Sequence, residues 1–361
     1  MRFFPLCVRF LLFFSFVART VFPSSLPAPE YSEAFFAGQS DTRSYFVNFY
    51  AFITTLSKEF MDFSMDMCYN KNKNGTRMPS TYAHKIFGEK VLAVLPKTLS
   101  EAFAQHLSAY WLGLHGPDLL FYHHPVLPNE TRRLGSRLHD LPAAGFFLNA
   151  RDEIRKDAET RRLPAQSTDL AAYAAGFLCH FALDSECHGY IGQRIAESGI
   201  SHTRIETEFD KHLLARNGEI ILGVNHAAHL KGRTEAARPA AILLGIPESA
   251  AKTSLKSFVR INGWLSSANP FLRAVIFSAL AVSGKYEELR GMFYDKKPCA
   301  ACAESNEILE AKLEQAIPVA ASLVSEFFEK LSDDRPLSER FGLDYNGKVP
   351  EGTTPSDGGN Q

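Results

Sequence analysis

The chain has 361 residues, of which 45% are hydrophobic and 22% are charged, and its formal net charge is −1. This is the composition of a globular protein, and the length allows one large domain with extensions or two ordinary domains. The balanced charge gives no electrostatic basis for nucleic-acid binding, and the six cysteines are too few for a disulfide scaffold. No apolar run reaches the ~20 residues of a membrane-spanning helix.

Residues 1–77 differ in composition from the rest of the chain. This region holds 14 of the 29 phenylalanines, whereas all 12 histidines lie after residue 83. A short apolar segment, Phe10 to Ala18, follows two arginines and is typical of an export signal, although small residues are poorly placed for cleavage. A polar linker ends the region, and Met78 and Pro79 follow it.

Two interpretations of this region stay open. In the first, residues 1–25 form a leader and the protein is exported. In the second, translation starts at Met78, residues 1–77 are a non-native extension, and the protein is cytoplasmic. We favour the second interpretation because of the phenylalanine excess and the absence of histidine.

Residues 78–332 are predicted to form an all-α domain. Strict alternation of apolar and polar residues is scarce, and apolar residues recur at helical spacing in 168–184, 203–214, 270–290 and 306–331. Prolines and glycines mark the connections between these segments. Residues 333–361 form a polar tail, rich in Pro, Gly, Ser and Thr at its end, which we predict to be disordered.

The segment 168–190 carries the first chemical signal. It predicts a buried helix, because His180 is the only strongly polar side chain between Leu170 and Leu183. His180, Asp184 and His188 follow at i, i+4 and i+8, and such positions spread over only ~80° of a helix face. A carboxylate between two imidazoles in a core is costly unless it is paired, and a divalent cation removes that cost.

A second predicted helix repeats the pattern. His202 and Glu206 have the same i, i+4 spacing, and Asp210 extends the row. For one helix, a hydrogen-bonded His–Asp pair is a sufficient explanation. Two helices with the same ligand types favour a metal site.

Other polar residues are weak signals when taken alone. They are His84, His115, Asp118 on a Gly-Pro turn, His139, the polar-loop pair His123 and His124, and the single CxxC pair Cys299 and Cys302. One CxxC pair does not define a structural zinc site.

Together these segments resemble the zinc-dependent phospholipase C family, in particular its intracellular-type bacterial members. The order His-x3-Asp, then His, then His-x3-Glu in residues 180–206 is similar to that family's metal-binding core. Residues 84–88, 116–118 and 135–139 resemble the preceding segments of the family, and Met78 and Pro79 are similar to its short N-terminus.

The resemblance implies an all-helical catalytic domain in residues 78–332, similar to phospholipase C and single-strand nucleases, around a multinuclear zinc site. The implied ligands are Asp118, His139, His180 and Asp184 for one ion, His188, His202 and Glu206 for a second, and His84 with a bridging Asp184 for a third. Secreted relatives complete the third site with an N-terminal tryptophan, a position that neither Trp111 nor Trp264 can take. A site with two zinc ions and a site with three therefore both stay open.

The resemblance implies a phospholipase C that uses metal-activated water to release diacylglycerol and a phosphorylated head group. Asp118 is the candidate catalytic residue, because a carboxylate ligand can also position or deprotonate the water. The expected partner is a phospholipid, which the protein would reach by peripheral membrane contact. No nucleic acid is expected as a partner. A single-strand nuclease-like or other phosphodiesterase and a non-catalytic zinc-binding protein are the alternatives.

Overall fold

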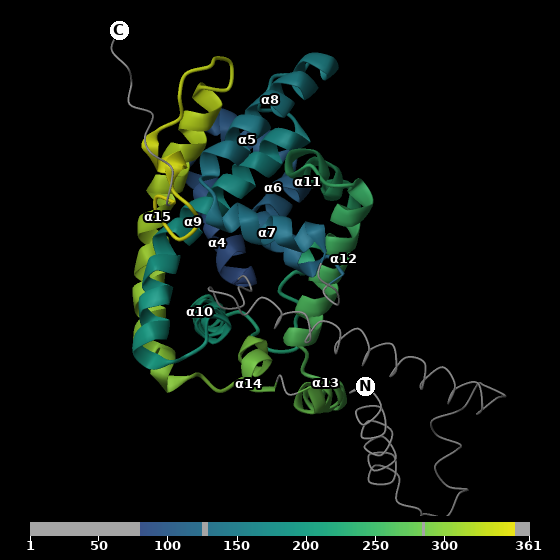
Figure 1. The fold of residues 1–361 in the computed structure, drawn as a ribbon, viewed down its shortest axis with the longest axis vertical. Coiled ribbons are helices and arrows are strands. Elements are labelled where there is room, and N and C mark those ends of the chain that lie inside the picture. Colours follow the sequence, from purple (N-terminus) through teal and green to yellow (C-terminus); the bar gives the residue numbers. More distant parts are fainter. Residues whose placement is uncertain (1–79, 125–128, 284–285, 351–361) are drawn as a thin grey trace, which may run out of the picture.

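The computed structural model describes residues 80–124, 129–283 and 286–350. The predictions for residues 1–77 concern a segment that lies outside the described residues. The described residues form α-helices and short 3-10 helices and no strand, which confirms the all-α prediction (Figure 1). No helix among them is long and apolar enough to cross a membrane.

The helices follow one another with short connections. In chain order they are α4 (Thr81–Val94), α5 (Lys97–Ala104), α6 (Leu107–Gly113), η1 (Gly116–Tyr122), α7 (Glu130–Asp140), α8 (Ala143–Arg161), α9 (Asp169–Ser198), α10 (His202–Arg216), η2 (Ala228–Leu230), η3 (Thr234–Ala236), α11 (Ala237–Leu244), α12 (Glu248–Leu265), α13 (Pro270–Ser283), α14 (Tyr286–Leu289), η4 (Arg290–Met292), η5 (Ala300–Cys302), α15 (Ala303–Glu329) and η6 (Glu339–Gly342).

Helix α9 is the central element of the domain. Every residue from Leu170 to Asp184 is buried, because α4, α6, α8 and α15 pack around this part of the helix. Its apolar composition therefore matches its environment. The long helix α15 lies beside it along one edge of the domain (Figure 1).

The helices α6 and α9 approach each other closely at two glycines. A Cβ atom on Gly176 would lie 2.2 Å from the carbonyl oxygen of Tyr110, and one on Gly113 would lie 2.2 Å from the carbonyl oxygen of Tyr173. Only residues without a side chain fit there. This close packing brings the end of α6 to His180.

Side-chain caps fix where α9 and α10 begin. Thr168 starts α9, since its hydroxyl accepts a hydrogen bond from the N–H of Ala171, and Ser201 starts α10 by accepting from the N–H of Arg204. Gly199 ends α9 with a φ of 68°, a left-handed conformation that glycine adopts without strain. The turn between these helices places their polar residues on neighbouring faces.

The prediction of a disordered tail is wrong for residues 333–350. Phe341 and Tyr345 are fully buried, and the carbonyl of Leu343 accepts a hydrogen bond from the N–H of Ala143. The segment is polar in composition, but its two aromatic side chains bury enough apolar surface to hold it against the domain. The remaining part of the prediction, residues 351–361, lies outside the described residues.

Candidate metal centre

Eight histidine and carboxylate residues from five helices converge inside the domain. His84 comes from α4, Asp118 from η1 and His139 from α7, whereas α9 and α10 contribute the rest. Their side chains are buried or nearly so. The eight residues are His84, Asp118, His139, His180, Asp184, His188, His202 and Glu206. These are the residues that the sequence analysis singled out as ligands.

The first group is centred on Asp184. Ligand atoms of His84, Asp118, His180 and Asp184 all lie within 4.8 Å of one another. The Nε2 atoms of His84 and His180 lie 3.3 and 3.1 Å from the two carboxylate oxygens of Asp184. His139 joins this group through Asp118, since its Nε2 lies 3.0 Å from Oδ1 of Asp118.

The second group lies one helical turn further along α9. Ligand atoms of His188, His202 and Glu206 lie within 4.8 Å of one another. The Nε2 atoms of His188 and His202 lie 3.6 and 3.1 Å from Oε1 of Glu206. Because Nε2 of His188 is also 3.7 Å from Oδ1 of Asp184, the two groups adjoin each other.

Backbone carbonyls orient three of the imidazoles. Nδ1 of His139 lies 2.7 Å from the carbonyl oxygen of Gly135, and Nδ1 of His180 lies 3.2 Å from that of Leu114. Nδ1 of His188 lies 3.1 Å from the carbonyl oxygen of Tyr345. A carbonyl only accepts hydrogen bonds, so each Nδ1 carries a proton, and in the neutral ring each Nε2 presents a lone pair.

These lone pairs face carboxylate oxygens that cannot satisfy them. The Nε2 atoms of His139, His180 and His202, together with Oδ2 of Asp184 and Oε2 of Glu206, are buried and make no hydrogen bond. When the rings are neutral, these atoms are acceptors that face each other at 3.0–3.1 Å, which is repulsive and costly to bury without a partner. A divalent cation would accept both kinds of lone pair, so the residues fit zinc.

His84 is less constrained than the other histidines. Its ring stacks on that of His180 at a centroid distance of 4.3 Å, but its buried Nδ1 makes no hydrogen bond. No hydrogen bond among the described residues therefore determines which ring nitrogen of His84 carries the proton. This is the residue to which the family resemblance assigns the third ion, and the number of ions stays a prediction.

The histidines keep the carboxylates ionised. Burial by itself would raise the pKa of the Asp184 carboxyl, but with no cation bound the positive charge of His180 and His188 in their doubly protonated form outweighs burial and holds that pKa well below its usual range. In the same way, His202 and His188 outweigh burial and lower the pKa of Glu206. His180 and His139 outweigh burial and lower the pKa of Asp118. Anionic carboxylates are the form that binds zinc.

The segment that carries Asp118 is the 3-10 helix η1, which is more regular than the predicted Gly-Pro turn. Gly116 opens it with a φ of 42°, and a Cβ atom there would lie 2.4 Å from Cδ2 of His180. Backbone conformation and space therefore both require glycine. This fit holds Asp118 next to the imidazoles.

Asp210 lies outside both metal groups, although it extends the polar row of α10. Its carboxylate accepts hydrogen bonds from the N–H groups of Tyr82 and Ala83 at 3.0 and 2.8 Å, from the hydroxyl of Ser80, and from that of Tyr294 at 2.6 Å. It thus caps the N-terminus of α4, where a negative charge is favourable. The cap positions the helix that carries His84.

Several residues of this centre have no signal in the sequence. The acceptors for Nδ1 come from Leu114, Gly135 and Tyr345, and each acts through its backbone carbonyl. A third set of ligand types, His212, Glu307 and Glu310, was also not singled out and lies partly exposed between α10 and α15. Of the weaker candidates, His123 bonds to Asn129 in a polar loop.

A helical domain around two adjoining His-carboxylate groups defines an all-α protein with a candidate metal centre. A sequence profile of the family described as zinc dependent phospholipase C matches residues 83–258, which include all eight residues. The matched domain belongs to the zinc-dependent phospholipase C family, and its function is that of a zinc-dependent phosphodiester hydrolase. No curated protein and no solved structure matches the chain.

Proposed function

We propose that this protein is a phospholipase C that cleaves the phosphodiester on the glycerol side of phosphorus. The products are diacylglycerol and a phosphorylated head group. The observation that carries this proposal is the convergence of eight ligand-type residues, several of which have a buried atom without a hydrogen bond, inside a domain of this family. Two or three zinc ions are the cofactor that this donor set suits.

Zinc ions held by these residues would polarise the phosphoryl oxygens, neutralise the charge that develops on them and lower the pKa of a water molecule. The chain's own contribution is a rigid arrangement of ligands. The Asp184 carboxylate lies next to the Nε2 atoms of three histidines. The shortest of these separations is 3.1 Å, between Oδ2 of Asp184 and Nε2 of His180. Because its carboxylate has two oxygens, it is suited to bridge two ions.

Asp118 is the proposed catalytic residue. Its two oxygens lie 3.0 Å from Nε2 of His139 and 3.6 Å from Nε2 of His180, on a segment that Gly116 holds in place. The lowered pKa keeps its carboxylate charged. We propose that, beside its role as a ligand, it orients the attacking water and accepts a proton from it.

A three-substrate assay tests this proposal. The zinc-loaded full chain is incubated with phosphatidylcholine vesicles, with bis(p-nitrophenyl) phosphate and with single-stranded DNA, and the lipid products are identified. Diacylglycerol that disappears after chelation and returns with zinc is the expected result. Cleavage of DNA without lipid cleavage would support a nuclease instead, and zinc binding with no turnover would support a non-catalytic protein.

A further inference from the structure

The C-terminal loop, residues 343–348, lies against histidines of both ligand groups. The N–H of Tyr345 donates a hydrogen bond to the backbone carbonyl of His139 at 3.3 Å, and the two rings pack together at a centroid distance of 5.2 Å. The carbonyl oxygen of Tyr345 lies 3.1 Å from Nδ1 of His188. The loop is therefore anchored beside the first group and reaches a ligand of the second.

Hydrogen bonds within the loop keep it closed. The carboxylate of Asp344, which is 8% exposed, accepts from the N–H groups of Asn346 and Lys348 at 2.8 and 2.9 Å. The N–H of Gly347 donates to the carbonyl of Asp344 at 3.0 Å, and the N–H of Asp344 donates to the carbonyl of Lys348 at 2.8 Å. A turn closed in this way restricts the backbone of Tyr345, which lies inside it.

Gly347 lets the loop pack closely on α9 between the two groups. Its φ is 70°, and a Cβ atom there would lie 2.3 Å from the carbonyl oxygen of Ser185. Ser185 directly follows Asp184, and the next residue, Glu186, pairs with Arg340 shortly before the loop. Backbone conformation and space both require glycine, so a side chain at this position would displace the loop from α9.

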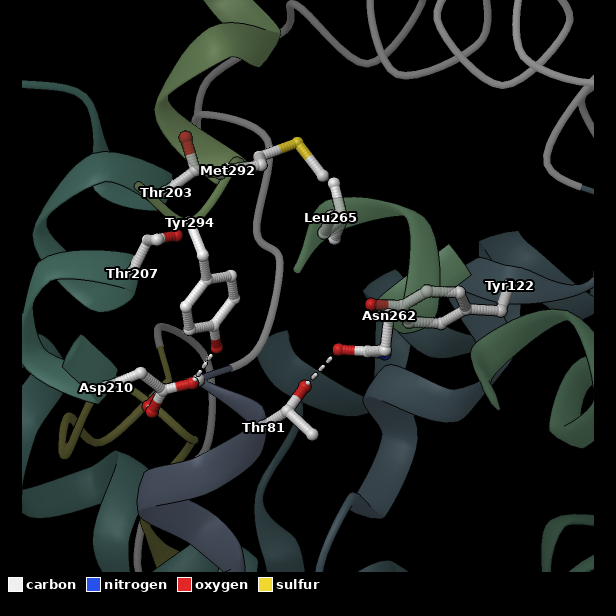
Figure 2. Close-up of a pocket in the computed structure, with 10 residues that line it drawn as sticks. Thr81, Tyr122, Thr203, Thr207, Asp210, Asn262, Leu265, Met292 and Tyr294 are labelled. Atoms are coloured by element: carbon white, nitrogen blue, oxygen red, sulfur yellow. Dashed lines mark hydrogen bonds between the residues drawn. The ribbon is translucent and has the colours of Figure 1, made fainter. Parts of the chain in front are cut away.

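The other ligands of the second group are held by different contacts. His202 and Glu206 lie on α10, and the carboxylate of Asp210 connects this helix to the N-terminus of α4 and to the hydroxyl of Tyr294 (Figure 2). These contacts do not involve the C-terminal loop. Displacement of the loop should therefore affect His188 while leaving the rest of the second group in place.

We propose that the C-terminal loop is a positioning element for the second group, so that zinc binding there and docking of the loop stabilise each other. Loss of a hydrogen bond to the second nitrogen of a metal-bound histidine lowers metal affinity by about 10- to 100-fold. Because linkage is reciprocal, zinc favours the docked loop by the same factor. The loop lies outside residues 83–258, which the family profile matches, so this role follows from its contacts alone.

Hydrogen exchange measured by mass spectrometry on the full chain tests this linkage, with zinc bound and after chelation. Zinc should slow exchange in residues 343–348 by about tenfold. The connection between α8 and α9, residues 162–167, carries no ligand and should exchange at the same rate in both states. Equal slowing in both segments would mean that zinc makes the whole chain more rigid, which would overturn the proposal.

Gly347→Ala should remove the zinc dependence of exchange in the loop and weaken zinc binding at the second group by about tenfold, measured by competition with a chelator. Asp344→Ala opens the turn without adding a steric contact, and should weaken the same binding by about fivefold. This second variant keeps the proposal testable if Gly347→Ala fails to fold.

The matched control is Gly245→Ala. Gly245 has a φ of 65° at the end of α11, and an added Cβ there would have nothing within 4 Å. The variant therefore carries the same backbone strain away from the metal centre. Its zinc affinity and its zinc-dependent exchange in the loop should stay native.

Three results would overturn the proposal. They are exchange of the loop that does not depend on zinc in the native chain, native zinc affinity in both loop variants, and a loss of affinity in Gly245→Ala equal to that in Gly347→Ala. In the last case backbone strain alone would explain the effect. A native chain that binds no zinc would contradict the metal centre itself and this inference with it.

Discussion

Two clusters of the same residue types differ in what surrounds them. The metal centre is buried, and several of its Nε2 and carboxylate atoms make no hydrogen bond. The surface cluster of His212, Glu307 and Glu310 is partly exposed. There, Nε2 of His212 lies 2.8 Å from Oε2 of Glu310, and Arg216 pairs with the other oxygen of that carboxylate at 3.4 Å. The surface residues pair with one another and with Arg216, whereas several atoms of the buried residues have no hydrogen-bond partner.

This contrast shows that spacing alone does not identify a metal site. His212 and Glu310 offer ligand atoms as close as those of the buried groups. What distinguishes the buried groups is that acceptors face acceptors in a low-dielectric interior. Variants of the two clusters can break this distinction or sharpen it.

The largest effect is expected for Asp184→Asn. The amide keeps the shape of the side chain but removes the charge that lies between His84, His180 and His188. Turnover should fall by at least about a thousandfold, and zinc content should fall with it. Native zinc content in this variant, measured by elemental analysis, would show that Asp184 does not bridge.

The control for this variant is Asp152→Asn. The Asp152 side chain is 69% exposed, and within the described part of the chain its ion pairs lie at the surface, where they contribute little. Activity and zinc content should match those of the native protein.

His188→Ala should have the next largest effect. It leaves only His202 and Glu206 in the second group, which is too few protein ligands to hold zinc tightly. We expect the loss of about one zinc ion per chain while the first group keeps its own. Equal loss of every ion would contradict the division into two groups.

Tyr345→Ala tests how the segment 333–350 supports the centre. The ring is fully buried, and the backbone carbonyl of Tyr345 orients His188. We expect a loss of about 3–5 kcal/mol in unfolding free energy and a fall of about tenfold in zinc affinity. Denaturant titration and competition with a zinc chelator measure the two effects.

Tyr345→Phe is the matched control. The hydroxyl is buried and makes no hydrogen bond within the described residues. Its removal should therefore leave stability and zinc affinity close to native values. If Tyr345→Phe and Tyr345→Ala behaved alike, packing of this ring would not be what positions His188.

The smallest effect is expected for His212→Ala at the surface cluster. Its partner Glu310 retains Arg216 and solvent, so stability should change by at most about 1 kcal/mol. Zinc content and turnover should stay native. A loss of zinc as large as in His188→Ala would mean that burial is the wrong criterion.

The sequence was sufficient for the helices that carry most of the candidate ligands. The i, i+4 spacing on α9 and α10 is a local property, and an apolar helix interrupted by His180, Asp184 and His188 can be recognised without tertiary information. Asp118 and His139 were different, because they are single polar residues in segments far from α9. Their inclusion depended on the resemblance to a family.

Other features could not be predicted because they arise from long-range contacts. Asp210 continues the polar row of α10, yet its hydrogen bonds run to the start of α4. Composition predicted disorder for 333–350, but Phe341 and Tyr345 bury their rings in the domain. In both cases the deciding partner lies more than a hundred residues away in the chain.

The most direct test of the metal centre is anomalous diffraction at the zinc edge from crystals of the full chain grown with zinc. We predict one ion among His84, Asp118, His139, His180 and Asp184 and another among His188, His202 and Glu206, with none bound at His212. Zinc found at the surface cluster while both buried groups remain without an ion would contradict the account.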